Sequence, residues 1–271
     1  MIQSYFFIPV NKPKFIAKVS TLKADNFIFD MEESVCEADF VSCIDNLKSI
    51  AIKPEYWVRI PVDYANVETS IPLLRQLWTL GWRNILLPKI NESYELSHFC
   101  SILPLGMRIG ILIESPRALL HFCQMIKENP CVQLVLIGSH DYCNSVGCKH
   151  EEANLMYLRQ KLLTECKAFN IPIVDYVSTN FTDLKAYQEE CKQANNMGFD
   201  GKAIIHPKQL DAFNHVEYYS QEEIMEAEMV VKAMQNIDIR DFATLNINGH
   251  LYEKPHLKRL YQIYEWNKKR K

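Results

Sequence analysis

The sequence predicts an α/β protein in which eight strands close into a (β/α)₈ TIM barrel, followed by a short C-terminal extension. Short apolar runs of strand length recur eight times along the 271 residues, and segments with apolar residues at three- and four-residue spacing separate them. Most of these runs lack polar alternation, which is typical of strands buried on both faces of a parallel sheet. A doubly wound open sheet is the second interpretation.

The expected strands are rich in β-branched and aromatic side chains and occupy residues 5–9, 26–30, 56–60, 84–88, 108–114, 133–138, 172–177 and 202–206. The expected amphipathic helices occupy residues 14–23, 67–80, 116–127, 154–169 and 182–197. This regular alternation favours a closed barrel over residues 1–236. Residues 237–271 are expected to form a hairpin-like turn and a helix that packs on the barrel or on a neighbouring subunit.

Composition excludes several classes of protein. The net charge of −3 gives no basic excess for nucleic acid, and no apolar run approaches the ~20 residues of a membrane span. The N-terminus shows no basic and apolar leader, so we expect a cytoplasmic protein. The nine cysteines are scattered and never form Cys-x-x-Cys, which favours reduced thiols over a zinc or disulfide framework.

Ionisable residues follow the carboxyl ends of six of the eight expected strands. In strand order they are Asp30, Glu32 and Glu33, then Arg59, Lys89, Glu114, Asp141 and His206. These ends converge on one face of a barrel, where the catalytic groups of such enzymes lie. A single ionisable residue at such a position would be interpreted as part of a salt bridge on the rim of the barrel. The full set offers carboxylates to a hard cation and cations to an anionic ligand.

A series of motifs occurs in a fixed order along nearly the whole chain. They are IPVNKP at 8–13, FDMEESV at 29–35, VRI at 58–60, LLPK at 86–89, LIESPRAL at 112–119, GSHDY at 138–142, GFDGKAIIHP at 198–207 and GHLYEKP at 249–255. This ordered set resembles the citrate lyase β-subunit-like proteins of the HpcH/HpaI aldolase/citrate lyase family. The chain departs from the family pattern at Val10, Lys12, Glu33 and Pro61.

The resemblance implies that Glu114 and Asp141 are ligands of Mg²⁺, and the chemistry agrees. Two carboxylates completed by water and substrate oxygens suit this ion, which is seldom enclosed by protein alone. The alternative is that either acid only caps a neighbouring helix. Arg59 is expected to grip the carboxylate or carbonyl oxygen of a keto acid, since a guanidinium gives two parallel hydrogen bonds. It also has a structural alternative, pairing with Glu32 or Glu33.

The remaining candidates carry weaker expectations. Glu32 and Glu33 would orient water or the metal's outer shell, or form structural pairs. Lys89 would act electrostatically or as a rim salt bridge. Lys12 and Lys18 would bind the phosphates of coenzyme A, as basic side chains do in relatives, or lie on a solvated helix. His206, followed by Pro207, is expected to lock a turn by hydrogen bonding rather than act as a general base.

The resemblance implies a Mg²⁺-dependent carbon–carbon lyase that cleaves or forms a 3-hydroxy acid, free or as a CoA or carrier-protein thioester. A keto acid such as oxaloacetate or glyoxylate would be the product, and a homotrimer or a multiple of it the assembly. A class II aldolase for free pyruvate is disfavoured because its early histidine is missing: no histidine precedes His98. A non-catalytic barrel that binds a keto acid or a partner subunit is the alternative of another class.

Overall fold

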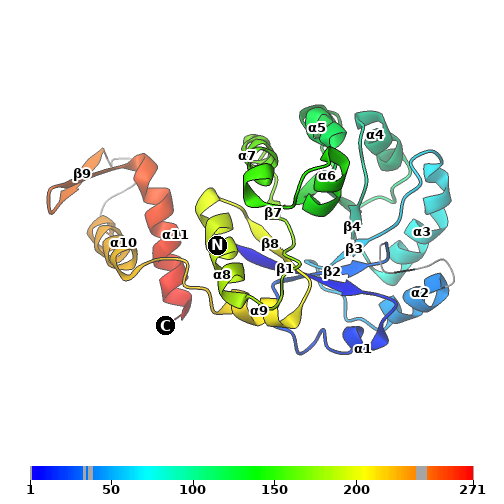
Figure 1. Ribbon diagram of the computed structural model, residues 1–271, viewed down its shortest axis with the longest axis horizontal. Helices are drawn as coiled ribbons and strands as arrows, with labels where there is room; N and C mark the ends of the chain where they lie inside the picture. The colour runs from blue at the N-terminus through cyan, green and yellow to red at the C-terminus, as the bar shows by residue number, and fades with distance from the viewer. Residues whose placement is uncertain (1, 33–34, 36–38, 236–242, 271) are drawn as a thin grey trace. The chain divides into compact units, whose positions relative to one another are not determined.

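The computed structural model describes residues 2–32, 35, 39–235 and 243–270, and its first compact unit spans Ile2–His215. Eight parallel strands form this unit's sheet (Figure 1). They are β1 (Gln3–Pro9), β2 (Asn26–Asp30), β3 (Trp57–Arg59), β4 (Asn84–Leu87), β5 (Arg108–Ile113), β6 (Val132–Ile137), β7 (Ile173–Asp175) and β8 (Gly201–Ile204). Because β1 pairs with both β2 and β8, the sheet closes. The predicted barrel is confirmed, and the open sheet is wrong.

Helices connect successive strands and lie outside the barrel (Figure 1). They are α1 (Pro13–Ile16), α2 (Phe40–Lys48), the 3₁₀ turn η2 (Val67–Ser70), α3 (Ile71–Leu80), α4 (Ser93–Ser101), α5 (Pro116–Glu128), α6 (Ser139–Val146), α7 (Glu152–Ala168), α8 (Leu184–Met197) and α9 (Pro207–Asn214). The helix expected over residues 14–23 is wrong in length, because α1 ends at Ile16 and turns follow it. Helix α1 buries none of its own residues, and Val19 in the following turn is the buried apolar residue of the stretch 14–23.

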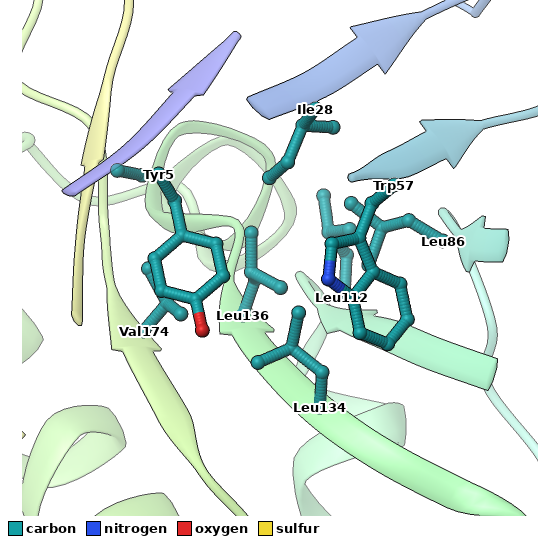
Figure 2. Packing of buried hydrophobic residues seen from close by; sticks show 9 residues of the cluster. Tyr5, Ile28, Trp57, Leu86, Leu112, Leu134, Leu136 and Val174 are labelled. Carbon is teal, nitrogen blue, oxygen red and sulfur yellow. The ribbon is translucent and has the colours of Figure 1, made fainter. Parts of the chain in front are cut away.

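The barrel interior is filled by inward-facing side chains of every strand, and Figure 2 shows Tyr5, Trp57 and their aliphatic neighbours pointing toward one another. Two glycines make room for the large rings. A Cβ at Gly110 would stand 3.0 Å from the Trp57 ring, and one at Gly201 would stand 2.5 Å from the Tyr5 ring. The centre of the barrel is therefore a packed core, and ligands must bind at an end.

A buried ionic group joins the outside of β7 and β8 to α7. Arg159 donates from Nε and Nη2 to the two oxygens of Asp175 at 3.1 and 2.9 Å, and Lys202 Nζ lies 3.3 Å from Asp175 Oδ2. All three side chains are fully buried. Because buried charges are tolerated only when paired, this group fixes the wall of the barrel and not its mouth.

A second compact unit spans Val216–Lys271 and contains α10 (Gln221–Met234), β9 (Thr244–Ile247), β10 (His250–Glu253) and α11 (Lys254–Arg270). The two strands form an antiparallel hairpin. Tyr252 Oη donates to Glu226 at 2.7 Å, which ties β10 to α10. The structure groups α10 with the hairpin and last helix, whereas the sequence analysis assigned it to the barrel. Within the described residues, no helix has the length and apolarity to cross a membrane.

Candidate active site

A cavity of about 120 Å³ lies at the carboxyl ends of the barrel strands. Its lining includes Arg59 from β3, Glu114 directly after β5 and Asp141 in the first turn of α6. Phe7, His140 and Ile205 contribute to the same lining, with aliphatic side chains below them. The structure therefore brings together the three residues for which the sequence predicts direct contact with metal or keto acid.

Glu114 is held at the mouth by the turn that follows β4. Its side chain is buried, with 5 % of the residue exposed, and the Lys89 backbone N–H donates to its Oε1. Lys89 adopts a positive φ of 56°, which is uncommon for a residue other than glycine. Helix α5 is capped by Ser115, whose hydroxyl accepts from Ala118 N at 3.0 Å. Glu114 is thus not the cap of this helix.

Asp141 lines the same cavity because Gly138, which has no side chain, lets the turn between β6 and α6 pass close to Glu114. A Cβ at Gly138 would stand 2.4 Å from Glu114 Cβ and 2.6 Å from its Oε2, closer than real side chains allow. Gly138 is itself the N-cap residue of α6, and no side chain caps that helix. The carboxylate of Asp141 is therefore not used in capping, and the helix N-terminus lies next to the acid.

The surroundings of Glu114 oppose the ionisation of its carboxyl group. Burial raises the pKa of Glu114 to about 8, and the nearby charge of Asp141 also raises it. The Lys89 N–H and the Arg59 guanidinium act in the opposite direction without reversing the shift. A divalent cation between the two carboxylates would favour their ionised forms.

This donor set fits Mg²⁺. Oxygen ligands suit the ion, and it keeps several waters when one or two carboxylates hold it. In the part of the chain that the structure describes, no three or more His, Cys, Asp or Glu side chains gather into a ready metal cage. A structural Zn²⁺ site, which has four protein ligands, is therefore not the kind of site formed here.

Arg59 is held by acidic side chains on β2 and beyond its end. Its Nε and Nη2 donate to the two oxygens of Asp30 at 2.7 and 2.8 Å, and its Nη1 lies 3.3 Å from Glu32 Oε2. The guanidinium also lies 5.3 Å from the centre of the Phe7 ring. The pairing with Glu32 that the sequence allowed is present. The contact with Asp30 was missed, although the two residues are register partners in the pairing of β2 with β3.

The other predicted residues divide into rim and surface positions. Lys89 Nζ pairs with Glu32, as a rim salt bridge would, and its side chain is 61 % exposed. Lys12 and Lys18 are both exposed and contribute nothing to the lining of this cavity, and Lys18 lies in the turn beyond α1. Glu33 lies outside the described residues.

His206 has the structural role expected for it. Its Nδ1 accepts a hydrogen bond from Lys208 N at 3.1 Å, so it caps α9, and its ring stacks on Phe181 with centroids 4.6 Å apart. Pro207 occupies the first position of that helix, where the missing N–H costs nothing.

A stacked histidine pair beside the cavity was not predicted. His140 and His150 have ring centroids 3.9 Å apart and an interplanar angle of 8°, and the Ser139 hydroxyl lies 2.8 Å from His150 Nε2. Burial lowers the pKa of His150, and the neighbouring His140 lowers it further. A neutral His150 therefore supports the turn that carries Asp141. The only sequence signal was a histidine next to that acid.

A closed barrel with two adjoining acids and an arginine at the carboxyl ends of its strands is typical of an enzyme active site. The comparisons with known proteins give its class, carbon–carbon lyase. The chain belongs to the HpcH/HpaI aldolase/citrate lyase family, whose family model matches residues 3–207. It is 26 % identical over 260 residues to the (3S)-malyl-CoA thioesterase of Cereibacter sphaeroides, covering 94 % of this chain and 90 % of that protein.

Two further similarities extend over most of the chain. The mitochondrial citramalyl-CoA lyase of Homo sapiens is 26 % identical over 283 residues, with 94 % of this chain and 82 % of that protein covered. The crystal structure of CitE from Mycobacterium tuberculosis, in complex with magnesium, acetoacetate and coenzyme A, superposes with a TM-score of 0.80 at 21 % identity and covers 97 % of each chain. That structural likeness shows the shared fold.

Proposed function

We propose that the chain is a Mg²⁺-dependent carbon–carbon lyase that cleaves or forms a 3-hydroxy acid or its CoA thioester, with a keto acid as one product. The observation that carries the proposal is the pair Glu114 and Asp141, which line one cavity together with Arg59. Family membership supports the reaction class. Relatives named as acting on malyl-CoA and citramalyl-CoA support a thioester substrate.

Each residue has a definite part in this proposal. Glu114 and Asp141 would hold the ion, which when bound polarises substrate oxygens as a Lewis acid. Arg59 would present its cation to the carboxylate or carbonyl oxygen of the keto acid. Asp30 and Glu32 would position Arg59 through the contacts described above. Lys12 and Lys18 remain proposed contacts for the phosphates of coenzyme A.

Burial in the cavity sets the protonation state of Glu114. The buried Glu114 carboxyl has a pKa raised to about 8, so it remains largely protonated at neutral pH until a cation takes the place of the proton. The apolar side chains of Phe7, Leu112 and Leu136 contribute to the cavity lining and limit the space for water. The site is therefore suited to excluding water from a developing negative charge.

Calorimetric titration of oxaloacetate, with and without Mg²⁺, tests the binding part of this proposal. We expect binding only in the presence of Mg²⁺ and no binding to Glu114→Gln. Incubation of the wild type with malyl-CoA or citramalyl-CoA, followed by assay for the released keto acid, then tests catalysis. Mg²⁺-dependent binding without turnover of either thioester would favour the non-catalytic alternative. Binding that is independent of Mg²⁺ would remove the metal from the site.

We also propose a cytoplasmic homotrimer or a multiple of it, in which residues 237–271 pack on the barrel or on a neighbouring subunit. The resemblance to the family supports the assembly, and a reducing compartment is supported by the thiol state of the described cysteines, which form no disulfide among themselves. Light scattering coupled to size-exclusion chromatography measures the mass of the assembly. A monomer at micromolar concentration would contradict the trimer.

A further inference from the structure

Two thiols lie against each other at the end of the barrel opposite the candidate site. Cys100 lies in the last turn of α4, and Cys131 immediately precedes β6. Their sulfur atoms are 2.9 Å apart, and both residues are half-buried. Cys131 is also tied to the sheet, because its carbonyl accepts from Ile109 N of β5 at 3.5 Å. The two sulfurs are therefore held in contact and remain reachable from solvent.

We propose that Cys100 and Cys131 form an oxidation site, at which a hydroperoxide converts the two thiols into a disulfide that thiol reductants reopen. A disulfide requires sulfur atoms about 2.03–2.05 Å apart, so the pair must approach by less than 1 Å. Both residues stand at the edges of elements, at a helix end and before a strand, where small backbone adjustments are cheapest.

The two thiols have different chemical roles in this step. The hydrogen bond from Cys100 lowers the pKa of Cys131 to about 7, and the same contact raises the pKa of Cys100. With hydrogen peroxide, the Cys131 thiolate attacks one oxygen, the O–O bond breaks, and a sulfenic acid and a hydroxide are formed. The hydroxide takes up the proton that the Cys131 thiol released on ionising, which gives one water. The Cys100 sulfur then attacks the Cys131 sulfur. The S–OH bond breaks, and the hydroxide leaves with the Cys100 proton as a second water. Peroxide receives the two electrons that the thiols lose.

Cys143, Cys166 and Cys191 lack this combination of contact and acidity. Burial raises the pKa of Cys191 to about 12, and it also raises the pKa of Cys166. Cys143 has Cys148 as a neighbour, but burial raises its pKa to about 11, so little of it is thiolate at neutral pH. Thiolate character and exposure together set the rate of oxidation, which favours Cys131 over these three cysteines.

The bond would close a loop that contains β5, α5 and Glu114. Cross-linking restricts the unfolded chain, so the oxidised protein is expected to melt roughly 5–10 °C higher than the reduced protein. Because Cys131 immediately precedes β6 and Glu114 follows β5, the cross-link lies at the far end of the parallel strands from the acids. It would leave the cavity lining unchanged.

The test treats the full chain with a small molar excess of hydrogen peroxide, blocks remaining thiols with iodoacetamide and maps cysteine peptides by mass spectrometry. Before alkylation we expect an intact mass lower by two hydrogen atoms, and after it a peptide linking Cys100 to Cys131. Dithiothreitol should reverse the oxidation fully. Alkylation of both cysteines after peroxide treatment would overturn the proposal. So would a disulfide that joins other cysteines, including Cys36, while Cys100 and Cys131 stay free.

Single substitutions separate the roles of the two sulfurs. Cys131→Ser should react with peroxide at least roughly tenfold more slowly, because the thiolate is lost. Cys100→Ser should stop at a sulfenic acid on residue 131, which dimedone traps. Cys123→Ser, at another half-buried thiol, is the matched control and should oxidise as the wild type does. Equal rates for Cys131→Ser and Cys123→Ser would overturn the assignment of Cys131 as the attacking thiol.

Discussion

Arg59 and Asp30 form a two-point ion pair between neighbouring strands, with Nε to Oδ1 at 2.7 Å and Nη2 to Oδ2 at 2.8 Å. Both side chains are nearly buried, and Oε2 of Glu32 lies 3.3 Å from Nη1, the third nitrogen of the guanidinium. A buried arginine with acids on two sides is firmly oriented. The residue expected to contact a keto acid is therefore also part of the structure of the barrel mouth.

Arg59→Lys should weaken keto-acid binding strongly while leaving Mg²⁺ binding nearly unchanged. Lysine keeps the charge but loses the planar pair of contacts to Asp30, so we also expect a loss of about 1.5–3 kcal/mol in the free energy of unfolding. Calorimetry with Mg²⁺ and oxaloacetate, beside urea denaturation, measures both effects. Equal loss of the two affinities would mean that Arg59 supports the metal site instead.

Asp141→Asn should abolish Mg²⁺-dependent binding of oxaloacetate without unfolding the protein. The amide is nearly isosteric, and a neutral oxygen is a much poorer ligand for a hard cation. Calorimetric titration with and without Mg²⁺ and a thermal melt check the two halves of the prediction. Asp211→Asn makes the same change at an exposed position on α9 and should bind as the wild type does. Unchanged binding by Asp141→Asn would remove this residue from the site.

Gly138→Ala should disturb the metal site by displacing Glu114. The added methyl group would stand 2.4 Å from Glu114 Cβ, so the acid must shift. We expect a loss of about 1–3 kcal/mol in the free energy of unfolding, together with weaker Mg²⁺-dependent binding. Gly110→Ala, which crowds Leu86 and Trp57 in the barrel core, should cost stability without a separate effect on binding in the folded fraction. Wild-type binding by Gly138→Ala would show that Glu114 does not need its present position.

The stability of the metal-free protein should fall with rising pH because of Glu114. Its pKa is about 8 in the folded protein and about 4.5 when unfolded, so the folded state binds the proton more tightly. Its contribution is fully present below pH 4.5 and is lost as the pH rises through about 8. Denaturation in a chelator, from pH 4.5 to 8.5, should show this loss in the wild type and a smaller loss in Glu114→Gln. Parallel pH profiles of the two proteins would contradict the raised pKa.

Mg²⁺ binding should release a proton over part of the same pH range, since the cation replaces the proton on Glu114. The affinity for Mg²⁺ should therefore increase up to about pH 8 and level off above it. Calorimetry in two buffers of different ionisation enthalpy measures the proton release directly. An affinity that does not change between pH 6 and 8 would show that the ion does not bind through this carboxyl.

Local sequence patterns predicted the strands well because each strand is an apolar run bounded by turn residues. Asn26–Asp30 is such a run, and every residue of β2 is buried. The same approach misjudged α1, since apolar spacing at residues 14–23 cannot reveal whether a surface exists to cover it. The ends of the strands were enough to place Glu114 and Asp141 together, because parallel strands of a barrel end at one face.

The sequence could not predict which side chains contact one another at the mouth of the barrel. Asp30 and Arg59 meet because their strands pair in one particular register, and a shift of either strand by one residue would turn its side chain to the opposite face. The donation from the Lys89 backbone to Glu114 depends on a left-handed turn that lysine seldom adopts. The nearness of Gly138 to Glu114 depends on how two loops pass each other in space.

The left-handed turn at Lys89 has a consequence for the cost of binding. With Oε1 of Glu114 held by a backbone N–H and Arg59 held by Asp30, both side chains have given up their rotamer freedom during folding. A ligand that arrives does not have to order them, which otherwise costs about 0.5–1.5 kcal/mol for each immobilised side chain. The site is preorganised, and the entropy that binding would otherwise lose has already been lost when the barrel formed.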